Sequence, residues 1–537
     1  MNMTQSTKKS KVGAKNAKDA KNAKNAKVTE VTKSNDTKTT KVAKAAKAKN
    51  TKAFKAKAAE FLKHFLVYAQ GFASLTFLVS IFSLNIIDFG LLVLLSVAFL
   101  ALLALSAIKL IINQKTPRST QAIFALISVA TIVAALAAFR YTDAANAFLN
   151  KITDQAPETK EYSVLVLKNS DYQDVHQLSD KSIGFLKTDP DLSQATSELK
   201  NVLSYDPHLA DTLDNLTTAI TTEQIPAIVL ESSRYDALAE DEFPITKITK
   251  VIYRFNITLA KEEPAASIDL TEEPFIAYIS GSDSRSGIKA AARSDVNILA
   301  VVNPKQHKIL LVSIPRDSYV QLHDTVGIKD KLTHAGIYGI NMSKTTIEDF
   351  LDVKIDYTIK VSFDTVVKVV DQLDGIDINS DQAMTLKTGD GSANKNKLCQ
   401  FAVGVQHVDG DCALRFARER KSYATGDRHR GENQQQVITA IINKITTEKS
   451  YLTKLPQILE IAGDSFETSF SRDNITALIR HQLGSGQGWQ TESIAIDGAG
   501  SMQPTYSMGS NLPLYVMLPD QASIAAAQAK IQAYLEK

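Results

Sequence analysis

The chain has 537 residues, of which 61 are Lys or Arg, 58 are Asp or Glu, and 44% are hydrophobic. The net charge of +3 hides an uneven distribution: residues 1–64 hold 18 Lys and four acidic residues, a charge of +14, so the remainder carries −11. This split indicates segments in different surroundings and excludes a single globule of balanced charge. Two Cys are too few for a disulfide-rich scaffold, a zinc ribbon or a thiolate cluster.

Residues 1–64 are predicted to form a disordered, Lys-rich cytoplasmic tail. Lys, Ala, Asn and Thr recur there with a degenerate three-residue period and few large aliphatic residues, so apolar burial cannot offset the ordering entropy. A basic tail beside a membrane is attracted to anionic lipid, whereas clustered Lys also attracts nucleic-acid phosphates without sequence preference. We expect anionic lipid as the partner and no specific nucleic acid.

Residues 65–140 contain three apolar runs, Phe65–Ile87, Phe89–Ile112 and Thr120–Phe139. Each reaches the roughly 20 residues that a helix needs to cross a membrane. With the Lys-rich tail held in the cytoplasm, three spans place everything after Arg140 outside the cell membrane. If the first two runs formed one broken span, the C-terminal part would instead stay in the cytoplasm.

Two folded units are predicted beyond the membrane. A polar linker at 141–160 precedes a small α/β accessory domain at 161–262 and an α/β domain, with a mixed sheet packed by helices, at 263–537. In the accessory domain we expect strands at Tyr162–Leu167, Ala227–Leu230 and Ile248–Leu259, and helices at Leu192–Leu203 and Ala210–Thr221. No pattern typical of catalysis appears in it.

Charged residues recur at strand ends in the second unit. Strands are predicted at Phe275–Ser280, Val296–Val302 and Lys308–Ile314. The charged residues that flank them are Asp283, Arg293, Asp295, Arg316 and Asp317. One such residue is ordinarily a solvated loop charge, but ligands of α/β sheets bind at strand ends. The combination suits a diphosphate with a divalent ion. Carboxylates hold the ion, guanidiniums bind phosphate oxygens, and the N–H groups of a Gly/Ser loop help to bind them.

A second basic cluster lies downstream and comprises Arg415, Arg418, Arg420, Arg428 and Arg430, followed by Gln434. A solvated helix face is the ordinary explanation for such a run. Arg gathered within a net acidic region is a local anomaly, however, and Arg suits bidentate phosphate recognition better than Lys.

An apolar stripe at helical spacing joins Phe363, Val366, Val367 and Val370. It is typical of a helix that faces the core, and a lipid pocket is the alternative.

Cys399 and Cys412 both fall in the external part of the chain. A disulfide between them would contribute about 3 kcal/mol, and two buried free thiols are the alternative.

Five motifs in this order resemble the LytR–CpsA–Psr family. They are Ser-Asp-Ser-Arg at 282–285, Arg-Ser-Asp at 293–295, Ser-Ile-Pro-Arg-Asp at 313–317, Lys-Leu-Thr-His-Ala at 331–335 and Asp-Gly-Asp-Cys-Ala-Leu-Arg-Phe-Ala-Arg-Glu-Arg at 409–420. Three helices and an accessory domain ahead of the motif-bearing domain resemble the capsule-associated members.

The resemblance implies a membrane-anchored phosphotransferase of Gram-positive-type cell envelopes. Such enzymes move a glycopolymer (teichoic acid, capsular or other wall polysaccharide) from a polyprenyl pyrophosphate carrier to peptidoglycan as a phosphodiester. Alternatives are a membrane-anchored regulator whose Lys tail binds nucleic acid, and a polyprenyl pyrophosphate hydrolase. The sequence contains no G-x-S-x-G, Walker or H-E-x-x-H motif.

The resemblance also implies roles for individual residues. Asp283 and Asp295 would hold Mg²⁺ or Mn²⁺, and both, with Arg316, would be catalytic. The residues expected to bind the pyrophosphate are Arg293, Arg316, Arg418, Arg420, Arg430 and Gln434. Asn433 stands where many members carry another Arg. The family has a tunnel for the polyprenyl tail, which strengthens the lipid alternative for Phe363 and its stripe.

Overall fold

The structure, a computed structural model, describes residues 16–536 except 88, 114, 154–156, 260–267, 283–287, 389–395, 424–425, 448–465 and 486–487. It divides into two compact units. One comprises Met1–Leu78 with Gly90–Ala138, and the other comprises Val79–Phe89 with Phe139–Lys537.

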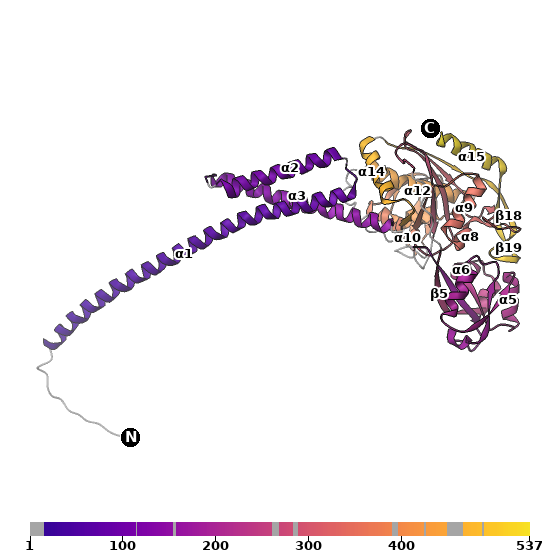
Figure 1. Cartoon of the computed structure of the whole chain (residues 1–537), viewed down its shortest axis with the longest axis horizontal. Coiled ribbons are helices and arrows are strands. Elements are labelled where there is room, and N and C mark those ends of the chain that lie inside the picture. Colours follow the sequence, from indigo (N-terminus) through magenta and orange to yellow (C-terminus); the bar gives the residue numbers. More distant parts are fainter. Residues whose placement is uncertain are drawn as a thin grey trace, which may run out of the picture. The chain divides into compact units, whose positions relative to one another are not determined.

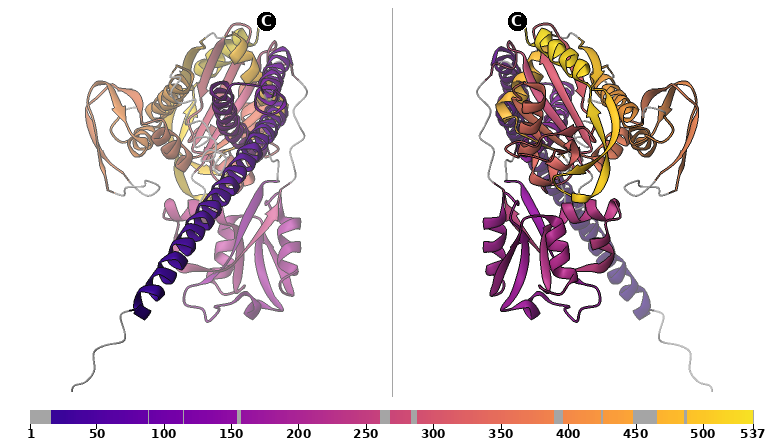
Figure 2. Two further views of the ribbon diagram at one scale, coloured as in Figure 1. Left: turned by 90° about the vertical axis from the view of Figure 1, so that its left-hand side faces the viewer. Right: turned by 90° about the vertical axis from the view of Figure 1, so that its right-hand side faces the viewer.

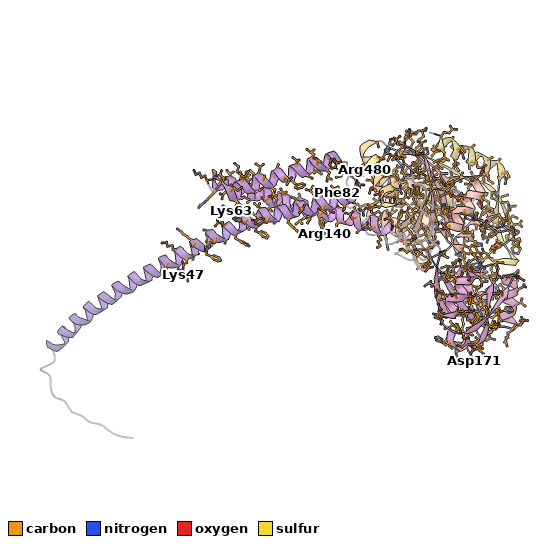
Figure 3. All side chains as sticks on the ribbon, in the orientation of Figure 1. Lys47, Lys63, Phe82, Arg140, Asp171 and Arg480 are labelled. Carbon is orange, nitrogen blue, oxygen red and sulfur yellow. A yellow bond between two sulfur atoms is a disulfide. The ribbon has the colours of Figure 1, made fainter. Side chains whose placement is uncertain are left out.

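Long helices form the N-terminal part of the described chain (Figure 1). They are α1 (Asn16–Leu84), α2 (Phe89–Ala107), continued by a short π-helix at Ile108–Ile112, and α3 (Arg118–Ile152). Within the described residues, three stretches are long and apolar enough to cross a membrane: Ala46–Leu84, Phe89–Ile112 and Arg118–Lys151. Side chains project outward along these helices (Figure 3), and among the large apolar ones Phe82 is 67% and Leu126 is 71% exposed. This surface suits lipid and confirms the three predicted apolar helices.

Residues 16–64 differ from the predicted disordered tail, because they form the first part of α1. Ala and Lys are strong helix formers, and the helix continues directly into the apolar stretch. A segment attached to an existing helix needs no new nucleus, so propensity alone suffices to extend it.

The accessory domain begins at β1 (Thr159–Leu167) and ends at β5 (Thr249–Thr258). Its five-stranded mixed sheet has the order β3-β2-β4-β1-β5. The other elements, in chain order, are a 3-10 turn (Val175–Leu178), β2 (Lys181–Leu186), α4 (Leu192–Lys200), β3 (Tyr205–Ala210), α5 (Leu213–Thr221), β4 (Ala227–Glu231), α6 (Ser232–Glu240) and α7 (Pro244–Ile248).

Two boundaries predicted for this region are wrong. Helix α3 runs to Ile152, so the first part of the predicted linker is helical. The helix predicted from Ala210 begins only at Leu213, because Ala210 ends strand β3. Strand β3 contains Pro207, which weakens the strand pattern, and it lies at the sheet edge, where proline is tolerated.

The C-terminal domain is built on a six-stranded mixed sheet with the order β16-β11-β6-β7-β8-β17. Its strands are β6 (Phe275–Ser282), β7 (Val296–Asn303), β8 (Lys308–Ser313), β11 (Tyr357–Ser362), β16 (Phe466–Thr468) and β17 (Gln490–Ala495). Strand β6 is antiparallel to β7 and parallel to β11, while β8 is antiparallel to β7 and parallel to β17. The predicted mixed sheet and its first three strands are confirmed.

Helices cover both faces of this sheet. On one face, α9 (Ile340–Leu351) and α15 (Gln521–Leu535) pack on a core that includes Leu299 of β7. On the other, α10 (Phe363–Gln372), α11 (Gly410–Ala417) and α12 (Asp427–Thr447) lie over a core that includes Ile298. The side chains of adjacent residues in β7 thus pack on opposite faces of the sheet, as the two-residue period of a strand requires.

Smaller elements complete the domain. They are β9 (Tyr319–Val320), β10 (Asp330–Lys331), α8 (Leu332–Ala335), a 3-10 turn (Gly336–Tyr338), β12 (Ile376–Ser380), β13 (Met384–Lys387), β14 (Leu398–Phe401), β15 (Gly404–Val408), α14 (Arg472–Ser485), β18 (Gly498–Thr505) and β19 (Gly509–Pro519). A disulfide joins Cys399 of β14 to Cys412 of α11, with a Cα–Cα distance of 5.5 Å.

The predicted apolar stripe packs mainly in the core. Phe363 and Val367 belong to the cluster beneath β7, Val370 is fully buried, and Val366 packs against the neighbouring cluster.

The accessory and C-terminal domains share one hydrophobic cluster. Leu230 and Leu238 of the accessory domain pack with Ile337, Tyr338 and Met508 of the C-terminal domain. Two views show the accessory domain directly against its neighbour (Figure 2). The two domains are therefore joined by a continuous core rather than by a linker alone.

Candidate functional site

The strands bring the predicted charged residues to one edge of the sheet. Asp295 directly precedes β7, and Arg316 lies three residues beyond β8. Asp295 is thus at the amino end of its strand, not at a carboxyl end. Because β7 is antiparallel to both β6 and β8, its amino end still meets their carboxyl ends.

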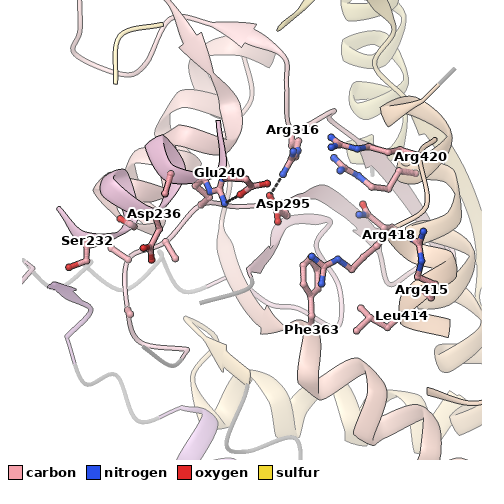
Figure 4. A pocket seen from close by; sticks show the side chains of 18 of the residues that line it. Ser232, Asp236, Glu240, Asp295, Arg316, Phe363, Leu414, Arg415, Arg418 and Arg420 are labelled. Carbon is pink, nitrogen blue, oxygen red and sulfur yellow. Dashed lines mark hydrogen bonds and ion pairs between the residues drawn. The ribbon is translucent and has the colours of Figure 1, made fainter. Parts of the chain in front are cut away.

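A cavity of about 930 Å³ opens at this edge (Figure 4). Its lining gathers seven of the predicted site residues: Arg293, Asp295, Arg316, Arg418, Arg420, Arg430 and Gln434. Phe363 lines it as well, so one residue of the apolar stripe reaches the cavity. Asp283, the other predicted metal ligand, lies outside the described residues.

Arg316 and Asp295 form an ion pair at the centre of the cavity. Nη1 of Arg316 donates to Oδ1 of Asp295 at 2.7 Å, and their side chains are 13% and 16% exposed. Burial opposes ionisation, but Arg316, Arg293 and Arg430 together hold the pKa of Asp295 below its usual value. Asp295 is therefore a carboxylate at neutral pH.

The loop after α11 and the start of α12 carry the second group of cations. The Asp409 side chain caps α11 by accepting a hydrogen bond from the Cys412 N–H at 3.0 Å. Beyond the end of α11, the Arg418 guanidinium lies over the Phe363 ring, 4.9 Å from its centroid. Arg430 on α12 is only 8% exposed. The cap, the disulfide and this ring contact together fix the direction of the arginines.

The motif at 331–335 contributes mainly support. His334 is buried, with Nδ1 2.6 Å from Oδ1 of Asp330. The neighbouring Thr333 hydroxyl lies 3.4 Å from Oδ1 of Asp295.

Asn433, where many members of the family carry another Arg, is fully buried and donates to the Phe416 carbonyl at 3.1 Å. It is not among the residues that line the cavity.

Several lining residues were not predicted as site residues. From the C-terminal domain these are Ala290, Ala291, Ala292, Lys387, Leu414, Arg415, Glu419 and Lys421, and from the accessory domain they are Glu161, Ser232, Ser233, Asp236, Ala239, Glu240 and Arg254. Arg415 and Lys421 fall within the basic cluster at 415–430, and this concentration of positive charge is the sequence signal that could have identified them. Nothing in the accessory sequence marks its residues, since their role depends on how the two domains pack.

Among the described lining residues, nine carry positive charge and five carry negative charge. Most of the cations are Arg, whose planar guanidinium binds phosphate oxygens in pairs. The cavity therefore suits a ligand with several phosphate oxygens.

Of the two predicted metal ligands the structure describes Asp295, which could hold a divalent cation only together with phosphate. Within the described part of the chain no group of three or more His, Cys, Asp or Glu is placed to hold a metal. Mg²⁺ is commonly held by one or two carboxylates plus substrate phosphates and water, and the ionised Asp295, whose Oδ1 accepts from Arg316, could supply one such ligand.

Comparison with known proteins gives a consistent result. Residues 244–522 match the profile of the LytR_cpsA_psr family. Polyisoprenyl-teichoic acid–peptidoglycan teichoic acid transferase TagU of Halalkalibacterium halodurans is 32% identical over 267 residues, which cover 49% of this chain and 80% of the relative. TagU of Bacillus subtilis is 36% identical over 216 residues, 40% of this chain and 66% of the relative, just under two thirds.

The crystal structure of B. subtilis TagV aligns with a TM-score of 0.41 and 28% identity, over 50% of this chain and 98% of that one. The family profile covers more than half of the chain, and the H. halodurans relative matches over most of its own length. The chain belongs to the LytR–CpsA–Psr family.

Proposed function

We propose that this protein is a membrane-anchored phosphotransferase that moves a glycopolymer from a polyprenyl pyrophosphate carrier to peptidoglycan. The observation that carries the proposal is the cavity in which Asp295 lies among Arg293, Arg316, Arg418 and Arg430. Relatives named as teichoic acid transferases support the same reaction. The arrangement of three helices and an accessory domain keeps capsular polysaccharide, besides teichoic acid, among the candidate glycopolymers.

The reaction needs little from the protein beyond positioning and charge. A hydroxyl of the acceptor sugar attacks the phosphorus that carries the glycopolymer, and the bond from that phosphorus to the bridging oxygen breaks. Polyprenyl phosphate leaves with the bond electrons, and a new phosphodiester joins glycopolymer to acceptor. The guanidiniums of Arg316, Arg418 and Arg430 neutralise charge on the transferred and leaving phosphates.

A proton must leave the attacking hydroxyl. Asp295 accepts a hydrogen bond from Arg316 inside the cavity, and Arg316, Arg293 and Arg430 keep it ionised. Asp295 can accept the proton where it does not ligate a metal. Asp283 and Asp295 would hold Mg²⁺ or Mn²⁺, and such an ion, when bound, would withdraw charge from the phosphate oxygens.

The topology is part of the proposal. The apolar helices anchor the chain, and the positive-inside rule retains the Lys-rich segment in the cytoplasm, next to anionic lipid. The cavity would then face the cell wall of a Gram-positive-type envelope, where peptidoglycan is found.

Reconstitution tests the proposal and its hydrolytic rival. The full-length protein in lipid nanodiscs would receive a polyprenyl-pyrophosphate-linked glycopolymer, with and without peptidoglycan. We expect glycopolymer on peptidoglycan and release of polyprenyl phosphate that depends on the acceptor. Equal release without peptidoglycan, with free glycopolymer phosphate as the product, would identify a hydrolase instead.

A further inference from the structure

The candidate active site is bounded on one side by the accessory domain. Helix α6 contributes Ser232, Ser233, Asp236, Ala239 and Glu240 to the lining, a set that we call the α6 wall. In Figure 4 the labelled residues of this wall lie on one side of the cavity, and the arginines that follow α11 lie on the other. Asp295 and Arg316 lie between these two sides.

Helical spacing explains why these residues share a face. Ser232, Asp236 and Glu240 follow one another at intervals of four residues, and Ser233 lies three residues before Asp236. Arg234 lies away from this stripe and is buried, as is Leu238 in the shared core. Helix α6 therefore presents one face to the cavity and uses another to hold its position.

A buried polar network fixes that position. The Arg234 side chain is 3% exposed, with Nε 3.1 Å from Oε2 of Glu231. Its Nη2 donates to the Tyr338 hydroxyl of the C-terminal domain at 2.6 Å, and that hydroxyl is 3.0 Å from Oγ of Ser507. The backbone N–H of Ser507 donates to Asp330 at 2.8 Å. Because buried ionic networks tolerate little displacement, the α6 wall is a fixed boundary of the cavity.

The wall also contacts the catalytic cluster directly. Glu240 forms an ion pair with Arg293, which the family motif identifies as a pyrophosphate ligand. Burial favours the neutral form of Glu240, but Arg293 and Arg316 hold its pKa below the usual value. Glu240 therefore stays charged and keeps Arg293 on the cavity side, which makes it a positioning residue.

The two sides of the cavity suit different parts of one ligand. A diphosphate is attracted by the arginines and repelled by the carboxylates of Asp236 and Glu240. Sugar hydroxyls, in contrast, donate hydrogen bonds to carboxylates and exchange them with serine hydroxyls. Phe363 and Leu414 add an apolar part to the lining. The cavity thus has three kinds of surface that match a polyprenyl diphosphate saccharide. The apolar part suits the polyprenyl tail, the arginines suit the diphosphate, and the α6 wall suits the sugar.

We infer that the α6 wall is the saccharide-binding side of the active site, with Ser233 and Asp236 contacting the sugar and Glu240 positioning Arg293. This inference rests on the proposed transferase function. The saccharide is either the donor sugar next to the diphosphate or the glycan of the acceptor, since both offer the same hydroxyls.

Two ligands that differ only in their sugar test the inference with the full-length protein in nanodiscs. The probes are polyprenyl diphosphate and the same lipid carrying the glycopolymer. Asp236→Ala should weaken binding of the sugar-bearing probe about tenfold, the value of one lost charged hydrogen bond, and leave the sugar-free probe unchanged. Glu240→Gln should weaken both probes, and Glu240→Asp, which keeps the charge, should restore the sugar-free one.

Glu242→Gln is the matched control, because Glu242 is an accessory-domain acid with a side chain 80% exposed and does not line the cavity. It should bind both probes as the wild type does. If Asp236→Ala instead raises the KM for peptidoglycan and leaves donor binding intact, the wall binds the acceptor glycan, which also supports the inference. Unchanged donor binding and unchanged KM values in Asp236→Ala and Ser233→Ala would overturn it. Failure of the wild type to bind the sugar-free probe would instead contradict the proposed function itself.

Discussion

Nη1 of Arg316 lies 2.7 Å from Oδ1 of Asp295, although 21 residues separate the two in sequence. The antiparallel pairing of β7 with β8 brings them together, because it places the start of one strand beside the end of the other. The charged centre of the site is therefore set by the register of the sheet, and ligand binding need not assemble it.

The disulfide should stabilise the segment that carries the arginines. Cys399 and Cys412 are 13 residues apart, and closing a loop of this length contributes about 3 kcal/mol. We expect Cys399→Ser/Cys412→Ser to lower the free energy of unfolding by about that amount and to weaken polyprenyl diphosphate binding, since α11 leads to Arg418. Chemical denaturation with and without reductant measures the effect, and a wild type insensitive to reductant would argue against it.

The junction between the two domains should depend on the buried pair of Glu231 and Arg234. Replacing Arg234 with Met leaves the Glu231 charge without its buried partner, at a cost of about 3–5 kcal/mol. The double variant Glu231→Gln/Arg234→Met should lose less, because no uncompensated charge remains.

An exposed pair serves as the control for that prediction. Arg254 and Glu161 form an ion pair at 2.8 Å, with Arg254 49% exposed, and Arg254→Met should cost less than about 1 kcal/mol. Thermal unfolding of each variant separates these cases. Equal stability of Arg234→Met and Arg254→Met would show that the buried network does not hold the junction.

The accessory domain should lose stability as the pH rises from 4 to 6. Burial, together with the charge of Glu231, raises the pKa of Asp189 from 3.8 to about 6. The folded state thus binds this proton more tightly than the unfolded state, so the stabilisation is complete below pH 4 and is lost as the pH passes 6. The loss is on the order of 2–3 kcal/mol.

Asp189→Asn removes the titrating proton and should flatten this pH dependence. Denaturation of both proteins at pH 4, 5, 6 and 7 gives the comparison. Parallel curves for the two proteins would contradict the assignment to Asp189.

Removing the Lys-rich segment should leave the chemistry intact. Residues 2–58 hold most of the positive charge of the N-terminal region, and the cavity is formed wholly by residues from Glu161 onward. A variant without residues 2–58 should transfer glycopolymer at the wild-type rate but bind less well to vesicles rich in anionic lipid. Loss of transfer in nanodiscs of fixed composition would favour a role centred on the tail.

Much of the site could be predicted from the sequence because its residues stand in contiguous motifs. Asp295, Arg316 and Arg418 were recognisable from charge recurring at strand ends and from Arg gathered in an acidic region. Strands β6 to β8 were readable because their apolar residues alternate between two buried faces.

The α6 wall could not be predicted, for a physical reason. Ser233, Asp236 and Glu240 look like an ordinary polar helix face, and only the packing of two domains turns that face toward Arg293. The extent of α1 was missed because a Lys/Ala segment without an apolar stripe shows no periodic signal, although its residues favour helix.

The most direct test of the central claim compares two arginines of the C-terminal domain. Arg316 lines the cavity and pairs with Asp295, whereas Arg428 is 43% exposed, pairs with Asp497 at 2.5 Å and does not line it. The measurement is the rate of glycopolymer transfer from polyprenyl pyrophosphate to peptidoglycan by full-length protein in nanodiscs. We predict that Arg316→Ala lowers this rate by at least about 100-fold in protein that is still folded at the assay temperature, while Arg428→Ala stays within about threefold of wild type. Wild-type transfer by a folded Arg316→Ala protein would contradict the account.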